Sequence, residues 1–168
     1  MKTKLHHLAL LFSVIFILNS CSSDATETSE TAEAKVQAVV EYTYSADELE
    51  AMKLINEYRV SIGLNTLEKI NHISYKSEEH DYYMIENNVV SHDDFVSRSE
   101  NIIKTLGAKT VGENIAYNFS SSKAAVEAWL KSPAHKANIE GNFTHFGIAI
   151  KVSPTTGKKY YTNIFAKI

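Results

Sequence analysis

The side chains that could do chemistry in this 168-residue chain are histidines, one glutamate and two asparagines set among small or apolar neighbours. They are His80, His92, Glu113, Asn114, His135, Asn138 and His145. Two or three imidazoles with one carboxylate suit a divalent ion such as zinc, and an open coordination position would make a bound water nucleophilic. The sequence has no G-x-S-x-G, H-E-x-x-H, P-loop or G-x-G-x-x-G motif, so the common catalytic signatures are missing.

Simple structural roles compete with chemistry for several of these residues. We expect Asn114 and Asn138 to satisfy backbone groups at a turn or a helix cap. His80 has acidic residues on both sides, and we expect it to be an exposed or half-buried helix residue. Trp129 lies at helical spacing with apolar residues, which indicates a place in the core.

Four helices are predicted to position these side chains. Ser45 and Glu48 form an S-x-x-E capping box before apolar residues at helical spacing, so the first helix begins there and ends at Gly63. The other predicted helices cover residues 71–86, residues 97–106 with Gly107 closing the helix, and a segment from Ser121 or Ser122 to Ser132-Pro133.

The strands are predicted near the end of the chain. Residues 111–116 read as a turn that feeds a short strand, and residues 146–152 and 160–165 form a hairpin around a turn at 154–157. Residues 36–44 are apolar enough to pair with the domain as a further short strand. Helices that precede strands, without βαβ alternation, predict an α+β fold with a mainly antiparallel sheet.

The start of the chain has the pattern of a secretory signal. Lys2 and Lys4 precede an apolar run over residues 8–18, which is short for a membrane span. The run ends in Leu18-Asn19-Ser20-Cys21, which resembles a bacterial lipobox and implies cleavage before Cys21 and its acylation. Several acyl chains would anchor the protein firmly to a membrane. The alternative is a plain secretory signal with an incidental cysteine.

Residues 21–45 are predicted to be a tether and residues 46–168 a single folded domain, after a signal peptide at 1–20. The tether is rich in Ser, Thr, Ala and Glu, and it lacks large apolar side chains over residues 22–34. The whole chain has a net charge of −3, and most of the negative charge that follows the signal peptide belongs to the tether. The balance of acidic and basic residues provides no basic surface for nucleic acid. The single cysteine excludes a disulfide within the chain.

A series of short segments resembles one known family when read in order along the chain. They are Ile55-Asn56-Glu57-Tyr58-Arg59, Glu79-His80, Ser91-His92, Gly112-Glu113-Asn114-Ile115-Ala116, Ala128-Trp129, Ser132-Pro133-Ala134-His135, Gly147-Ile148 and Asn163-Ile164-Phe165-Ala166. The series resembles the bacterial branch of the CAP domain, the family of cysteine-rich secretory proteins, antigen 5 and pathogenesis-related 1 proteins. The resemblance implies a three-layer α-β-α sandwich with helices on both faces of the sheet.

The resemblance also implies a polar cleft, which in this family carries two histidines and two glutamates. His92, Glu113 and His145 match three of the four positions. Ser132 stands where the second glutamate would be, and the bacterial branch carries a histidine three residues on, here His135. His92, Glu113, His135 and His145 are therefore the predicted cleft residues, and His92, His145 and Glu113 are the candidate zinc ligands. The family match at Glu79-His80 leaves open a place near the cleft for His80. A simpler role for Glu113 is to accept hydrogen bonds from His92 or the backbone and organise the cleft floor.

Three functions remain open from the sequence. The first is a lipid-anchored, extracytoplasmic, non-catalytic module of a bacterial cell envelope, whose cleft holds an ion, small molecule, lipid or peptide, because no nucleophile–base pair is recognisable. The second is a metal-dependent peptidase or esterase in which Glu113 is the base and His92 assists. The third is a structural envelope protein with a vestigial cleft.

Overall fold

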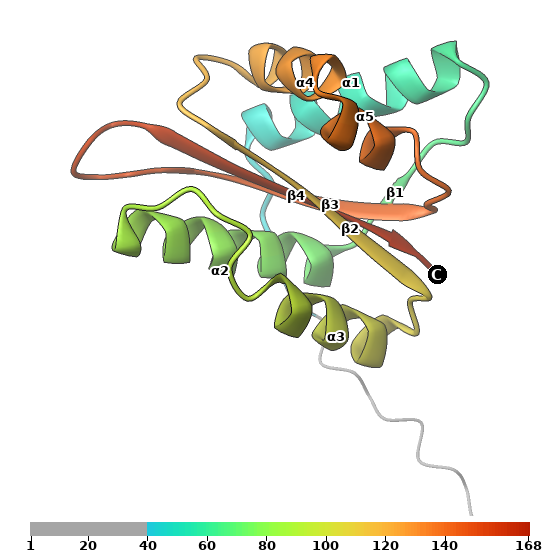
Figure 1. Ribbon diagram of the computed structural model, residues 1–168, viewed down its shortest axis with the longest axis horizontal. Coiled ribbons are helices and arrows are strands. Elements are labelled where there is room, and N and C mark those ends of the chain that lie inside the picture. Colours follow the sequence, from blue (N-terminus) through green and yellow to red (C-terminus); the bar gives the residue numbers. More distant parts are fainter. Residues whose placement is uncertain (1–39) are drawn as a thin grey trace, which may run out of the picture. The chain divides into compact units, whose positions relative to one another are not determined.

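Residues 40–168 are described by the computed structural model, and they form a mixed sheet covered by helices on both faces (Figure 1). The predicted signal peptide, Cys21 and the tether up to residue 39 lie outside the described residues. The helices are α1 (Ala46–Ser61), α2 (Asn71–Asn87), α3 (Phe95–Leu106), α4 (Ser122–Lys131) and α5 (Pro133–Ile139). The strands are β1 (Glu68–Lys69), β2 (Thr110–Tyr117), β3 (His145–Val152) and β4 (Lys159–Lys167).

The sheet has the strand order β1-β3-β4-β2, with β1 parallel to β3 and the other pairs antiparallel. Helices α1, α4 and α5 cover one face, and α2 and α3 cover the other (Figure 1). The predicted α+β class, the mainly antiparallel sheet and the three-layer α-β-α sandwich are confirmed.

Local sequence signals, such as helix caps, predicted the four helices correctly. Ser45 Oγ accepts the Glu48 amide, and the Glu48 carboxylate accepts the Ser45 amide, so the predicted capping box is present. Gly107 ends α3 in the left-handed conformation, as its position predicted. The hairpin of β3 and β4 is also confirmed.

Other elements differ from the sequence prediction. The turn predicted within residues 111–116 is wrong, because that whole segment belongs to β2 and pairs with β4. The fourth helix does end at Ser132, but Pro133 then starts α5, since proline suits the first turn of a helix. The two-residue β1 was not predicted. Residues 40–44, the described part of the predicted strand 36–44, are not a strand.

Side chains cap the outer side of β2 and the part of β3 that extends beyond its short pairing with β1. On β3, the amides of Ile148 and Ile150 donate to Ser74 Oγ at 3.2 Å and to Glu48 Oε1 at 2.9 Å. On β2, the carbonyls of Glu113 and Ile115 accept hydrogen bonds from side chains of α5 and α4. A sheet edge capped in this way has few free groups left to pair with another strand.

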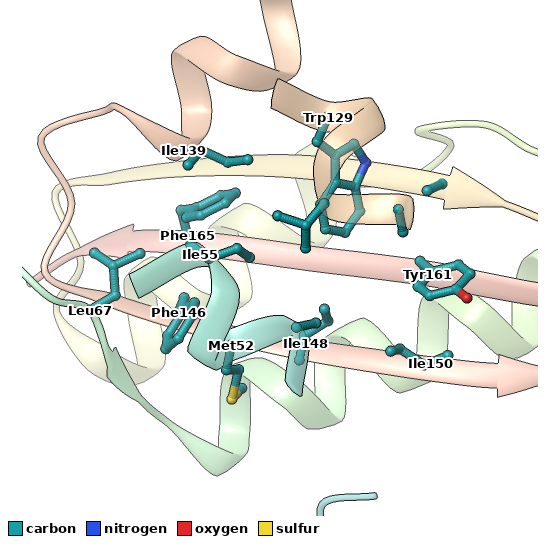
Figure 2. Packing of buried hydrophobic residues seen from close by; sticks show 14 of the residues in the cluster. Met52, Ile55, Leu67, Trp129, Ile139, Phe146, Ile148, Ile150, Tyr161 and Phe165 are labelled. Atoms are coloured by element: carbon teal, nitrogen blue, oxygen red, sulfur yellow. The ribbon is translucent and has the colours of Figure 1, made fainter. Parts of the chain in front are cut away.

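The larger core lies between the sheet and helices α1, α4 and α5. Figure 2 shows Ile55 between Phe165 of β4 and Phe146 of β3, with Trp129 and Ile148 in the same layer of the core. A smaller cluster on the opposite face joins α2 and α3 to β4. These two layers fix β2 at the sheet edge, between α3 and α5.

Helix α2 approaches β3 closely because Gly147 has no side chain. A Cβ at Gly147 would lie 2.6 Å from the carbonyl carbon of Ile73, which is closer than real Cβ contacts come. Among residues 40–168, no helix is long and apolar enough to cross a membrane.

Candidate functional site

A buried ion pair between Glu113 and Arg98 forms the floor of the candidate site. Glu113 lies in the middle of β2, and its side chain is 1% exposed. Arg98, on the inner side of α3, donates from Nε to Glu113 Oε2 at 3.0 Å and from Nη2 to Oε1 at 2.9 Å. Both oxygens of the carboxylate are therefore held by one guanidinium, the geometry that best compensates a buried charge.

His92 completes this cluster from the loop between α2 and α3. Its Nδ1 lies 2.8 Å from Glu113 Oε1, and 49% of its side chain is exposed. An ionised carboxylate only accepts hydrogen bonds. His92 Nδ1 therefore carries a hydrogen and donates a hydrogen bond to Glu113. In the neutral ring, Nε2 then has a free lone pair on the exposed side.

The loop that carries His92 is fastened on both sides of that residue. His80 Nε2 donates to the Ser91 carbonyl at 2.8 Å, and Arg98 Nη1 donates to the Asp93 carbonyl at 2.6 Å. The Tyr83 hydroxyl donates to the Asp93 carboxylate at 3.0 Å. His92 therefore sits between two anchored neighbours.

The prediction that His80 is exposed or half-buried is wrong. The residue is 1% exposed, and its ring stacks on Tyr83 and reaches the loop at Ser91. Burial lowers the pKa of His80, and the nearby positive charge of Arg98 lowers it further.

His135 lies on α5 and is half-buried. Partial burial lowers the pKa of His135, and the charge of His92 adds to that effect. The Asn114 side chain donates to the His135 carbonyl at 2.9 Å, and Asn138 donates to the Glu113 carbonyl at 3.0 Å. Both asparagines thus satisfy backbone groups as predicted. Asn114 does so from within β2 and Asn138 from within α5, so neither lies at a turn or a cap.

The two remaining family positions are not gathered around Glu113. His145 begins β3, where Thr144 Oγ1 lies 2.8 Å from its Nδ1 and Glu68 lies 3.7 Å from its Nε2. Strand β4 separates it from β2, and two strand spacings put the backbones roughly 10 Å apart. Ser132 is half-buried at the junction of α4 and α5.

The candidate zinc set of His92, His145 and Glu113 is therefore not assembled. Among residues 40–168, no group of three or more His, Cys, Asp or Glu side chains is arranged to hold a metal ion. Both oxygens of Glu113 already accept hydrogen bonds from Arg98, and Oε1 accepts a further one from His92. These residues do not fit a metal centre, and no chemical step is assigned to one.

Arg98 is the residue that the sequence reasoning missed. It precedes Ile102 by four positions, so the two side chains share one face of α3, and both are buried. A lone cation in the apolar stripe of a helix indicates a buried acidic partner, and this signal could have revealed Arg98.

Comparison with known proteins gives consistent matches. The model of the cysteine-rich secretory protein family (CAP) matches residues 52–165. An uncharacterized membrane protein of Bacillus subtilis, YlbC, is 35% identical over 130 residues, which are 73% of this chain and 35% of that protein. The chain therefore spans about a third of the length of this relative.

Solved structures share the fold at low sequence identity. An extracellular SCP-domain protein of Bacillus anthracis has a TM-score of 0.63 and 24% identity, covering 76% of this chain and 45% of its own. An outer surface protein of Borrelia burgdorferi has a TM-score of 0.62 and 24% identity, covering 75% and 98%. Venom allergen-like protein 4 of Schistosoma mansoni has a TM-score of 0.60 and 10% identity, covering 74% and 90%.

Proposed function

Because the chain belongs to the cysteine-rich secretory protein (CAP) family, we propose that it is a binding module outside the cytoplasm that holds its ligand at His92 and His135. The observation that carries this proposal is that Arg98 and His92 both hydrogen-bond to the carboxylate of Glu113. It leaves Glu113 as a residue that orients His92, and it leaves the exposed side of the His92 ring for a ligand.

The chemistry of the exposed ring indicates what kind of group it would bind. With Nδ1 donating to Glu113, the neutral ring presents an acceptor at Nε2. The lowered pKa of His135 favours the neutral form of that ring. Two neutral imidazoles suit a ligand that donates hydrogen bonds, such as a peptide amide or a hydroxyl group of a small molecule or lipid headgroup.

The arrangement favours binding over hydrolysis. A metal-dependent hydrolase would need Glu113 as a free base and a set of metal ligands beside it. Glu113 instead accepts hydrogen bonds from both partners while its side chain is 1% exposed.

We also propose that the protein is anchored by lipid at Cys21 to a membrane of a bacterial cell envelope. The lipobox-like sequence at Cys21 supports this, as do the names of relatives described as a membrane protein, an extracellular protein and an outer surface protein. Metabolic labelling with a fatty-acid analogue should mark the wild type but not Cys21→Ser. Equal labelling of both would contradict the anchor.

A ligand titration tests the binding site. The Cε1–H resonances of the histidines are followed by NMR in the folded domain while a tripeptide amide, a disaccharide and a lipid headgroup analogue are added in turn. At least one probe should shift His92 saturably, and His92→Phe should abolish its binding. The matched control His145→Gln should leave it unchanged, because strand β4 separates His145 from β2, and Thr144 and Glu68 are its neighbours. Saturable shifts at His145 alone, or none at all, would contradict the proposal.

A further inference from the structure

The loop of residues 88–94 depends on a buried histidine that the proposed binding site does not use. His80 projects from α2, and its Nε2 donates to the carbonyl of Ser91, the residue immediately before His92. This hydrogen bond fastens the near side of the loop, while Arg98 and Tyr83 fasten the far side at Asp93. The backbone adopts left-handed conformations at Asn88 and Asp94, the two ends of the loop.

The second nitrogen of His80 has no partner. Its Nδ1 is buried and has no hydrogen-bond partner within the described residues, and the residue as a whole is only 1% exposed. In the neutral ring this nitrogen bears a lone pair without a donor, which carries the moderate cost of an unpaired neutral group. In the protonated ring it would bear a buried N–H without an acceptor, which is much more costly.

The charges around His80 act in opposite directions. Arg98 of α3 and His92 of the loop oppose a positive charge on His80, whereas Glu113 of β2 and Asp93 of the loop favour one. Both oxygens of Glu113 are engaged by Arg98, and the carboxylate of Asp93 is held by Tyr83 at the exposed surface. Burial and Arg98 outweigh the acidic groups, so the pKa of His80 lies below its ordinary value.

We propose that His80 is the positioning residue of the His92 loop, and that protonation of His80 releases residues 88–94 and withdraws His92 from Glu113. This proposal rests on the proposed function, since release of the loop would regulate the same binding site. When the loop opens, His80 reaches water and takes up a proton near its ordinary pKa of 6.5. Protons bind the open loop better than the closed one, so acid favours opening.

The size of the effect follows from this linkage. Below pH 6.5 the population of open loops rises by up to about tenfold for each pH unit, until the closed form also becomes protonated. Amide hydrogen exchange measures this population directly, because the protection factor of a loop amide falls as the loop opens more often.

Three proteins are compared between pH 7.5 and pH 5.0. In the wild type, the protection factors of residues 88–94 should fall at least fivefold, while those of the β4 amides stay constant. His80→Gln keeps a donor near the position of Nε2 but does not titrate, so its loop protection should stay within twofold. His72→Gln is the matched control on the same helix, where His72 contacts Asn101, and it should behave as the wild type.

Two results would overturn the proposal: constant loop protection in the wild type, or an equal fall in His80→Gln. If His80→Gln does not fold, the imidazole ¹⁵N spectrum of the wild type decides the matter. His80 should be the neutral Nε2–H form at pH 7.5 and should become protonated as loop protection falls. Loss of protection while His80 stays neutral would refute the mechanism. No ligand is added, so these outcomes are independent of the binding test.

Discussion

Arg98 holds both carboxylate oxygens of Glu113, through Nε to Oε2 at 3.0 Å and through Nη2 to Oε1 at 2.9 Å. The same guanidinium donates from Nη1 to the Asp93 carbonyl, next to His92. One side chain therefore fixes the acceptor that orients His92 and the loop that carries it. This relationship links the stability of the domain to the geometry of its candidate site.

Removal of Arg98 should be costly. Arg98→Met leaves the buried Glu113 carboxylate without its partner, and we expect a loss of about 3–5 kcal/mol in the free energy of unfolding. Urea denaturation measures this loss. The double variant Arg98→Met with Glu113→Gln should recover part of the loss, because no charge is then stranded.

The exposed pair between Lys53 and Glu57 provides the control for Arg98. Lys53→Met removes a cation from a solvent-exposed ion pair, which should cost no more than about 1 kcal/mol. If Arg98→Met costs no more than Lys53→Met, the buried pair does not have the role assigned to it.

Gly147 should not tolerate a side chain. In Gly147→Ala the added carbon would meet the backbone of α2 at Ile73 and Ser74, which has no room to yield. We expect a loss of about 1–3 kcal/mol, measured by thermal or urea unfolding. Gly157→Asn is the control, since a Cβ there meets nothing within 4 Å and asparagine accepts the left-handed backbone. Equal stability of Gly147→Ala and the wild type would contradict the close approach of α2 to β3.

Asp81 should make stability fall as the pH rises. Its carboxyl is buried, it accepts a hydrogen bond from Thr162 at 2.6 Å, and burial raises its pKa well above 3.8. The folded state therefore keeps a proton that the unfolded state loses above pH 3.8, so stability is present below that pH and is lost toward the folded-state pKa.

Asp81→Asn removes this dependence. Relative to the wild type, the variant should gain up to about 1.4 kcal/mol for each pH unit in that range, as measured by urea unfolding from pH 4 to pH 8. Asp94→Asn, at an exposed position, controls for the lost charge. If the difference in the free energy of unfolding between Asp81→Asn and the wild type does not change with pH, the carboxyl of Asp81 is not buried in its protonated form.

Zinc should find no specific site at these residues. Isothermal calorimetry of the metal-free domain should show no saturable heat that His92→Ala abolishes, because His145 lies apart and Glu113 is held by Arg98. A saturable heat with a defined stoichiometry in the wild type that is lost in His92→Ala would contradict this prediction.

The sequence predicted most where the signals were local. The capping box at Ser45 and Glu48 and the glycine end at Gly107 depend on neighbours within a few residues, and both were predicted correctly. The pairing of His92 with Glu113 was also among the sequence hypotheses, through the simpler role given to Glu113.

The features that were missed depend on contacts between distant segments. Strand β1 has only two residues and exists through its pairing with β3. The inward turn of His80 depends on where the loop carbonyl of Ser91 lies, and no local pattern gives that position. His145 was grouped with Glu113 by family resemblance, whereas the strand order separates them.

The most direct test of this account is the tautomer of His92, read from its imidazole ¹⁵N resonances in a long-range proton–nitrogen spectrum at neutral pH. We expect Nδ1 of the His92 ring to carry a proton and to donate a hydrogen bond to Glu113, because an ionised carboxylate only accepts hydrogen bonds. Glu113→Gln should shift the ring toward the Nε2–H form. A wild-type ring protonated at Nε2, or a tautomer that does not respond to Glu113→Gln, would contradict the claim that Glu113 orients His92 for binding.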